Sequence, residues 1–196
     1  MRKLSIISAY TNLKGEKMFF RELETKDILL KNIGHDDAEF VLKQFSTDEV
    51  NTYLFDMEPM ASVEEAEEMI DFYCEKEPRS WHRWILVLKE NGQKIGTCGF
   101  HNWKRETSET DIGYDLQPEY WRKGYMSLCM VSILKFAKEE MKVSHVYAHI
   151  AVGNTASEKL AEKSGFIKTG KTYYEVFRGQ KYLHNIYALD FKEGMK

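Results

Sequence analysis

One short stretch of the chain, residues 111–127, constrains the fold more than any other part. It reads Asp-Ile-Gly-Tyr-Asp-Leu-Gln-Pro-Glu-Tyr-Trp-Arg-Lys-Gly-Tyr-Met-Ser, which predicts an apolar strand, a turn bounded by Pro118 and the start of a long helix. The first amides of a helix lack an acceptor within it, and the helix dipole leaves that end partly positive. Gly124 allows close backbone approach, and Arg122 and Lys123 add charge, so the stretch favours a phosphate-binding turn. Taken alone, an ordinary strand-to-helix turn with two solvated cations explains it equally well.

The length and charge of the chain indicate one globular domain. Its 196 residues are enough to bury a single core, and the 43% hydrophobic and 30% charged residues exclude a disordered or fibrous chain. We expect an extension over residues 1–18 and one domain over residues 19–196. The net charge of −3 is unevenly spread, because residues 35–78 hold fourteen acidic residues against Lys43 and Lys76. An acidic segment within a basic remainder favours binding of a cationic and an anionic ligand at different places, although acidic helix residues commonly just face water.

The three cysteines, Cys74, Cys98 and Cys129, indicate a reducing compartment. They are odd in number and have neither metal-ligand nor redox spacing, so we expect no bound metal and a cytoplasmic location. The apolar stretch near the start is too short for a secretion signal, and no stretch reaches the roughly 20 apolar residues of a membrane-spanning helix. We therefore expect no membrane partner. The basic residues form no stripe with interleaved aromatic residues, which argues against direct nucleic-acid binding.

Hydrophobic periodicity predicts the order of the elements. The order is a strand, two helices, three antiparallel strands, a helix, a strand, a helix and two final strands. The strands are expected at Asp27–Ile33, Trp84–Lys89, Lys94–Trp103, Thr110–Leu116, Val146–Val152, Thr169–Phe177 and Tyr182–Phe191. The helices are expected at Ala38–Phe45, from Ser62 until Pro78 stops it, from Tyr125, and at Thr155–Ser164. Ser62 with Glu65 predicts a capping box, and Asn91-Gly92 between two apolar runs predicts a hairpin turn.

Four motifs in this order resemble those of the GNAT superfamily of acyl-CoA-dependent N-acyltransferases. They are Asp-Ile-Gly-Tyr at 111–114, Tyr-Trp-Arg-Lys-Gly-Tyr-Met-Ser at 120–127, Asn-Thr-Ala-Ser at 154–157 and Lys-Ser-Gly-Phe at 163–166. The resemblance runs from about Met18 to Phe191 and is nearest to the branch of ribosomal-protein N-terminal (alanine/serine) acetyltransferases. It implies an α+β fold of three layers, in which a mixed central sheet flanked by helices contains a splayed pair of strands.

The resemblance also implies a site for acetyl-CoA, with the pyrophosphate on the turn and pantetheine between the splayed strands. The implied coenzyme-binding residues are Tyr114, Asp115, Leu116, Trp121, Arg122, Lys123, Gly124, Tyr125, Met126, Ser127, Asn154 and Ser157. Met126 stands where the family has a small residue, so its side chain must point away from the phosphate, and Arg122 replaces a glycine common in this branch. An amide within Ile112–Tyr114 would polarise the thioester carbonyl. Gly113 within a strand predicts either close approach of a ligand or an ordinary bulge.

The implied reaction is transfer of an acetyl group to a primary amine by direct attack in a ternary complex. It calls for a base to take the ammonium proton and an acid for the departing thiolate. Asp111, just before Ile-Gly-Tyr, is the expected base, with Glu109 second and His149 third. Ser157 is expected to donate to the thiolate. The structural alternatives are ion pairing for Asp111, strand packing for His149 and hydrogen bonding within a helix for Ser157.

The acceptor is expected to be cationic, because the resemblance places the acidic segment 35–78 near the entrance. A protein N-terminus is one candidate, and a polyamine or an aminoglycoside is the alternative. The aromatic residues that core packing explains as well as an acceptor site are Tyr53, Phe55, Trp81, Trp84, Tyr182 and Tyr187. A non-catalytic acyl-CoA-binding regulator also fits the motifs, and the family contains both monomers and homodimers.

Overall fold

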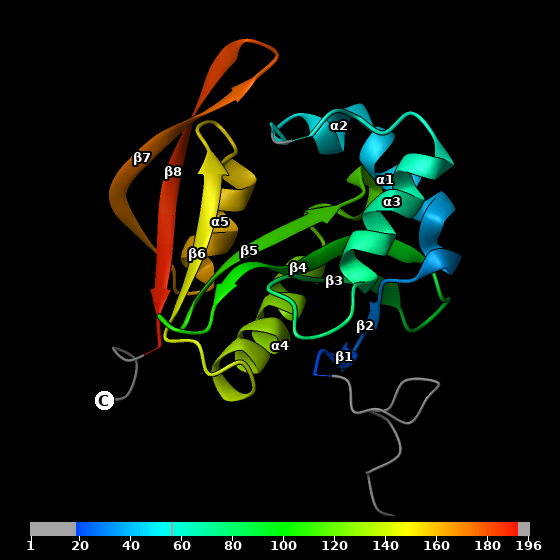
Figure 1. Cartoon of the computed structure of the whole chain (residues 1–196), viewed down its shortest axis with the longest axis horizontal. Coiled ribbons are helices and arrows are strands. Elements are labelled where there is room, and N and C mark those ends of the chain that lie inside the picture. Colours follow the sequence, from blue (N-terminus) through cyan, green and yellow to red (C-terminus); the bar gives the residue numbers. More distant parts are fainter. Residues whose placement is uncertain (1–18, 56, 192–196) are drawn as a thin grey trace, which may run out of the picture.

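The computed structural model describes residues 19–55 and 57–191, and the extension expected at 1–18 lies outside them. Within the described part, a mixed sheet of eight strands has the order β1-β2-β3-β4-β5-β6-β8-β7 (Figure 1). The strands are β1 (Leu23–Glu24), β2 (Ile28–Asn32), β3 (His82–Leu88), β4 (Lys94–Lys104), β5 (Glu109–Leu116), β6 (His145–Ala151), β7 (Ile167–Phe177) and β8 (Gln180–Asp190). The helices are α1 (Ala38–Ser46), α2 (Asp48–Asn51), α3 (Val63–Cys74), α4 (Tyr125–Glu139) and α5 (Thr155–Lys163), with single 3-10 turns at His35–Asp37 and Pro118–Tyr120.

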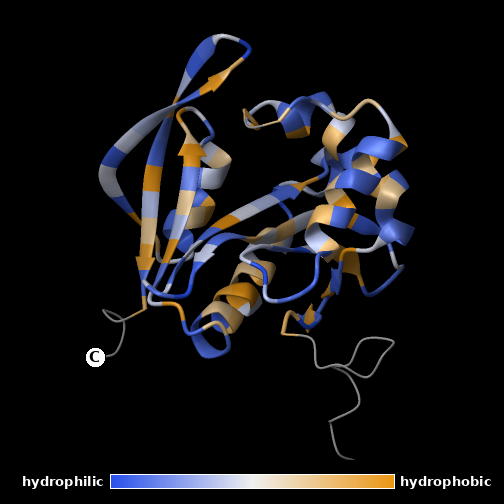
Figure 2. Ribbon diagram, viewed as in Figure 1, coloured by the Kyte–Doolittle hydropathy of each residue, from blue (hydrophilic) through white to orange (hydrophobic). Residues whose placement is uncertain are grey.

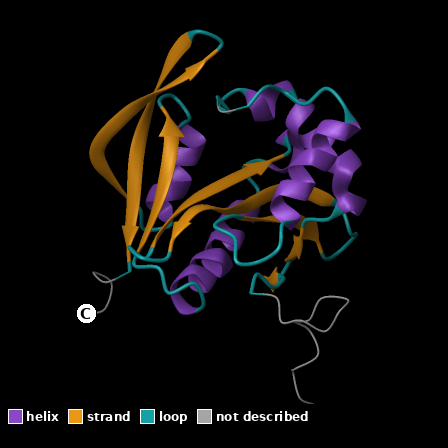
Figure 3. Cartoon of the chain, in the orientation of Figure 1, coloured by secondary structure: helices purple, strands orange, loops and turns teal. Residues whose placement is uncertain are grey.

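The sheet separates two layers of helices (Figure 3). Alternate side chains of a strand point to opposite faces, and β3 supplies both cores. Its Trp84 and Leu86 pack in the core that contains α4, whereas Ile85 packs in the core of α1 and α3. Apolar and hydrophilic residues accordingly alternate along the strands and the helices (Figure 2). The expected α+β fold of three layers is confirmed.

β5 and β6 diverge after a short parallel contact. Their register covers only Glu109–Asp111 against His145–Tyr147, while β5 continues to Leu116 along β4. Figure 1 shows β6 and β8 turning away from the half of the sheet that holds β2 to β5. The expected splayed strand pair is therefore present, and Asp111 is the last residue of β5 that is paired on this side.

Local signals in the sequence account for several element boundaries. Ser62 accepts a hydrogen bond from the Glu65 amide at 3.4 Å, as expected for the start of α3. The Glu65 carboxylate, however, accepts from the amide of Ala61 at 2.8 Å and not from that of Ser62. At the predicted hairpin turn, Gly92 has φ +73° and the Asn91 side chain accepts from the Gln93 amide at 3.0 Å.

Two of the expected boundaries that differ from the structure have a clear cause in the backbone. Val152 lies outside β6 and is 53% exposed, because the chain turns at Gly153, which has φ +98°. The last hairpin has a two-residue turn, Arg178–Gly179, with φ values of +50° and +74°, as the twist of paired strands favours. Gln180 and Lys181 consequently belong to β8 and not to the loop.

Candidate active site

A cleft of about 880 Å³ opens where β5 and β6 separate. It is lined by the end of β5, the turn after it, the N-terminal ends of α4 and α5, and part of the segment around α2. The expected coenzyme-binding residues that line it are Tyr114, Asp115, Leu116, Trp121, Arg122, Gly124, Tyr125, Met126, Ser127, Asn154 and Ser157. Lys123 is not among the lining residues, and its Nζ lies 5.2 Å from the centre of the Tyr120 ring.

The N-terminus of α4 can bind an anion. The helix begins at Tyr125, and Leu128 supplies the amide that bonds back to the carbonyl of Gly124, at 3.2 Å. The amides of the three residues before Leu128 lack acceptors within the helix, and the first turn contains no acidic residue. The Met126 side chain packs in the core and is only 6% exposed, so it leaves these amides accessible from the cleft. The expected phosphate-binding turn has the required geometry.

Two residues of this turn have left-handed backbone conformations. Gly124 has φ +82° and Arg122 has φ +60°. A Cβ atom at Gly124 would meet no atom within 4 Å, so glycine is needed there for the backbone angle and not for space. Arg122 adopts the same region although it carries a Cβ atom, which stores backbone strain beside the helix N-terminus.

Substitutions at these two positions should have opposite effects on stability. Arg122→Gly relieves the strain, so we expect the free energy of unfolding to rise by about 0.5–1 kcal/mol. The lost charge should raise KM for acetyl-CoA by roughly twofold to fivefold. Gly124→Ala introduces the same strain and should lower the free energy of unfolding by about 1–2 kcal/mol. Urea unfolding and initial rates measure both quantities, and a less stable Arg122→Gly protein would contradict the assigned strain.

The backbone of β5 presents alternate residues to the gap. The Gln117 amide donates to the Ile95 carbonyl at 2.9 Å, and such pairs recur at every second residue of an antiparallel ladder. Asp115 therefore faces β4 with its backbone, whereas Tyr114 and Leu116 face the gap. This corrects the expectation that the Asp115 backbone binds pantetheine. The Leu116 carbonyl accepts from the indole of Trp121 at 2.8 Å, which holds that ring along the cleft.

The Asp115 side chain belongs to a buried polar cluster. Its carboxylate accepts from Arg83 Nη1 at 3.1 Å, from the Thr97 hydroxyl at 2.6 Å and from Gln44 Nε2 at 2.7 Å. Burial raises the pKa of Asp115, and the Arg83 guanidinium and the hydrogen bonds only partly oppose that effect. The cluster joins β3, β4, β5 and α1, so Asp115 holds the wall of the cleft in place.

Gly113 is explained by packing within the protein. A Cβ atom there would lie 3.1 Å from His101 Nε2, closer than a side chain normally approaches. Burial, reinforced by the nearby Arg83, lowers the pKa of His101 to about 3, so this imidazole is neutral. The packing of His101 of β4 accounts for glycine at this position, and the approach of a ligand at Gly113 stays a prediction.

Two hydroxyl groups meet on the α5 side of β5. Tyr114 Oη lies 2.8 Å from Ser157 Oγ. Burial raises the pKa of Tyr114, against the opposing effect of Ser157, so its phenol keeps its proton at neutral pH. Asn154 accepts from the Ser157 amide at 3.2 Å and caps α5. The sequence predicted Ser157 and Asn154 here, but it indicated only the backbone of Tyr114 and not its hydroxyl.

A carboxylate and an imidazole meet on the opposite face of β5. Asp111 Oδ1 lies 3.4 Å from His149 Nε2, and Asp111 Oδ2 accepts from Asn102 Nδ2 at 2.8 Å. Burial raises the pKa of Asp111, but the hydrogen bonds from His149 and Asn102 outweigh it and leave the pKa below its usual value. The second candidate base, Glu109, accepts from the hydroxyl of Tyr147 at 3.3 Å. The first and third candidates thus form a pair, whose partner Asn102 was not predicted.

Three aromatic candidates for an acceptor site are explained by packing. Trp84 is fully buried in the core beside α4. Tyr187 is 2% exposed in the same core. Trp81 stacks on Phe72 with 4.4 Å between ring centres, at the C-terminal end of α3.

The other three aromatic candidates lie at the cleft or near it. Tyr53 lines the cleft, and its hydroxyl donates to the Gly153 carbonyl at 3.0 Å. Phe55 stacks on Tyr182 of β8 with 3.7 Å between ring centres. The segment between α2 and α3 therefore contacts both the start of α5 and the last hairpin.

Residues 19–55 and 57–191 were compared with the requirements of a metal-ligand cluster and of a membrane-spanning helix. No group of three His, Cys, Asp or Glu side chains in these ranges is placed to hold a metal ion. None of the helices described there is long and apolar enough to cross a membrane.

A family model described as an acetyltransferase (GNAT) domain matches residues 27–167. The chain belongs to the GNAT acetyltransferase family. An uncharacterised N-acetyltransferase of Bacillus subtilis (strain 168), YoaA, is 32% identical over 172 residues, covering 87% of this chain and 97% of YoaA. As in other GNAT acetyltransferases, the acetyl donor is acetyl-CoA, so the chain is an acetyl-CoA-dependent N-acetyltransferase.

Solved GNAT structures share the fold. A spermidine N-acetyltransferase from Vibrio cholerae, in complex with CoA and spermine, superposes with a TM-score of 0.75 at 18% identity, covering 86% of this chain and 98% of that one. RimL, a ribosomal L7/L12 alpha-N-protein acetyltransferase in complex with CoA, gives 0.76 at 16% identity, covering 85% and 95%. These two neighbours carry different acceptors in their names, so the likeness shows the fold and leaves the acceptor of this GNAT enzyme open.

Proposed function

We propose that this GNAT enzyme transfers the acetyl group by direct attack of a primary amine on the thioester, in a ternary complex. The observation that carries the proposal is the position of Asp111 and His149 at the point where β5 and β6 separate. The N-terminus of α4, the proposed phosphate site, lies in the cleft at the other end of the exposed part of β5, and Asp111 and His149 are not among the residues that line that cleft. Phosphates at α4 would direct pantetheine along β5 toward the splay point, where the amine arrives.

His149 is the proposed proton acceptor, and Asp111 is the proposed positioning residue. The Asp111 carboxylate already accepts from Asn102 and faces His149, and its lowered pKa makes it a weak base. Because Nε2 of His149 faces that carboxylate, its other ring nitrogen can take a proton from the attacking ammonium. His149, the third candidate base from the sequence, is thus proposed in place of Asp111, the first candidate.

The proposed hydrogen-bond donors to the oxyanion and to the thiolate come from the backbone of β5 and from the side chains of Tyr114 and Ser157. The Ile112 amide is used in the parallel pairing of Asp111 with Tyr147. The next amide directed toward the gap is that of Tyr114, and it can stabilise the oxyanion. The protonated hydroxyl of Tyr114, bonded to Ser157, can donate to the departing thiolate. Tyr114 and Ser157 therefore act as one hydroxyl pair and not as a lone serine.

Removing the phenol should slow the reaction without weakening coenzyme binding. Tyr114→Phe is expected to lower kcat by about tenfold to 100-fold, since it removes the proposed proton donor to the thiolate. Ser157→Ala should cost less, and the double variant should be about as slow as Tyr114→Phe alone, because the two hydroxyls act together. Initial rates give the comparison. Multiplied effects of the two substitutions would contradict a shared role.

The function is tested by release of free thiol from acetyl-CoA, with and without a panel of N-terminal peptides, polyamines and aminoglycosides. Acceptor-dependent release names the acceptor class. Calorimetric binding of CoA runs in parallel. Binding of CoA without release for any amine would overturn the proposed transfer and favour the acyl-CoA-binding regulator.

The cellular compartment, the domain bounds and the oligomeric state are also proposals. Cys98 and Cys129 are buried free thiols and Cys74 is an exposed one, which supports a reducing, cytoplasmic compartment. The domain bounds 19–196 and the choice between monomer and homodimer call for limited proteolysis and light scattering.

A further inference from the structure

We propose that Glu175, within a frame of aromatic side chains, binds a second positive charge on the amine acceptor. This inference rests on the proposed function, because it adds a subsite to the acceptor side of the same site. It makes the preferred acceptor a slender amine with two separated cationic groups.

A continuous series of rings leads from the proposed base toward the last hairpin. His149 contacts Tyr173 of β7 with 5.4 Å between ring centres, and Tyr173 stacks on His184 of β8 at 5.0 Å. Phe55 lies 5.9 Å from His184 and stacks on Tyr182 at 3.7 Å. Because the series starts at the partner of Asp111, we assign it to the acceptor whose amine reaches His149.

Glu175 shares this face of the hairpin. Its partner across the ladder is Tyr182, while Tyr173 faces His184, and residues directly opposite in a ladder have side chains on the same face. Glu175 is half-buried and lies two residues from Tyr173, or about 7 Å along the strand. Within the described part of the chain, its carboxylate has no hydrogen-bond or ion-pair partner. Glu58 by contrast is paired with Arg178.

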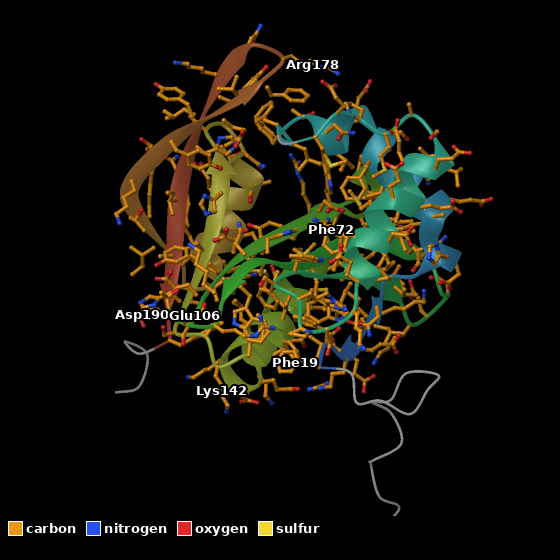
Figure 4. The ribbon with its side chains drawn as sticks, in the orientation of Figure 1. Phe19, Phe72, Glu106, Lys142, Arg178 and Asp190 are labelled. Atoms are coloured by element: carbon orange, nitrogen blue, oxygen red, sulfur yellow. The ribbon has the colours of Figure 1, made fainter. Side chains whose placement is uncertain are left out.

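A carboxylate set among aromatic rings suits an ammonium group, since charge attraction and the ring faces both favour it. The protein shows this chemistry at the outer end of the same hairpin. Arg178, at its tip in Figure 4, lies 5.0 Å from the centre of the Phe177 ring and pairs with Glu58. The Glu58 and Phe55 contacts join the segment between α2 and α3 to the hairpin, which favours a slender acceptor over a bulky one.

The test compares linear amines of equal length with one or two amino groups, such as hexylamine and 1,6-diaminohexane. In the wild-type enzyme we expect kcat/KM for the diamine to exceed that for the monoamine by about fivefold to tenfold. Glu175→Gln should bring this ratio close to one. Glu67→Gln, which removes the same charge from the exposed face of α3, should leave the ratio at its wild-type value.

Adjacent tyrosines of β7 provide a second matched pair. Tyr173→Leu should lower the diamine preference, whereas Tyr174→Leu, on the outer face and 61% exposed, should not. Calorimetry with protein saturated with CoA measures amine binding without turnover. Equal affinity for the two amines, or a preference that survives Glu175→Gln, overturns the subsite. Thiol release that no amine stimulates overturns the proposed function instead, and the binding comparison still decides the subsite.

Discussion

Replacement of His149 by glutamine is expected to lower kcat by about 100-fold to 10,000-fold with any amine acceptor, the usual contribution of a positioned proton acceptor. Glutamine keeps the polarity of the side chain but cannot take up the proton. KM for acetyl-CoA should change little, because His149 is not among the residues that line the cleft at the N-terminus of α4, the proposed phosphate site. Steady-state rates over a range of pH measure the effect.

Two neighbouring carboxylates provide the controls for this assignment. Asp111→Asn keeps the imidazole but weakens its orientation, so kcat should fall by a smaller factor, about tenfold to 100-fold. Glu109→Gln should change kcat by less than about threefold, because its carboxylate is held by Tyr147 and not by His149. A loss in Glu109→Gln as large as that in His149→Gln would show that Glu109 is the base.

The parts of the site that the sequence predicted are local in the chain. The turn before α4 and the cap of α5 each depend on a few consecutive residues whose conformational preferences are strong, such as Gly124 and Asn154. Such signals do not require knowledge of the sheet register. The resemblance then supplied the order in which these segments assemble.

The parts that the sequence missed depend on register between distant segments. Tyr114 and Ser157 are 43 positions apart, and their hydroxyls meet only because β5 diverges from β6. Asn102 reaches Asp111 from an irregular stretch of β4, where its own φ is +51°. A shift of one residue would move each side chain to the other face. Periodicity places a side chain on one of two faces without saying which neighbour it meets.

The acidic segment led to an incomplete expectation for the same reason. The carboxylates of α3 are exposed, and Glu49 of the same acidic segment lines the cleft. The carboxylate that we assign to acceptor binding, Glu175, lies in a strand whose sequence shows no excess of acidic residues. Its significance comes from the rings placed around it by β8 and Phe55.

Arg83→Met is expected to give the largest loss of stability, about 3–5 kcal/mol in the free energy of unfolding. Arg83 and Asp115 are 11% and 9% exposed and form an ion pair at 3.1 Å. Methionine preserves much of the packing volume but leaves the Asp115 carboxylate buried without its cation. Urea denaturation of the two proteins at neutral pH measures the difference. Asp115→Asn should cost less, since Arg83 still lies over the rings of Phe45 and Tyr73.

The pH dependence distinguishes this electrostatic cause from a general packing defect. Burial already raises the pKa of Asp115 in the wild-type protein, while Arg83 lowers it, so the pKa should rise further in Arg83→Met. A carboxyl group with a raised folded-state pKa binds more protons in the folded state, and stability then falls as pH rises between the unfolded and folded pKa values. The deficit of Arg83→Met should therefore shrink on acidification. Adding Asp115→Asn to that variant should recover part of the stability at neutral pH and remove this pH dependence. If the loss of stability in Arg83→Met and in the double variant did not change with pH, the loss would be assigned to packing alone.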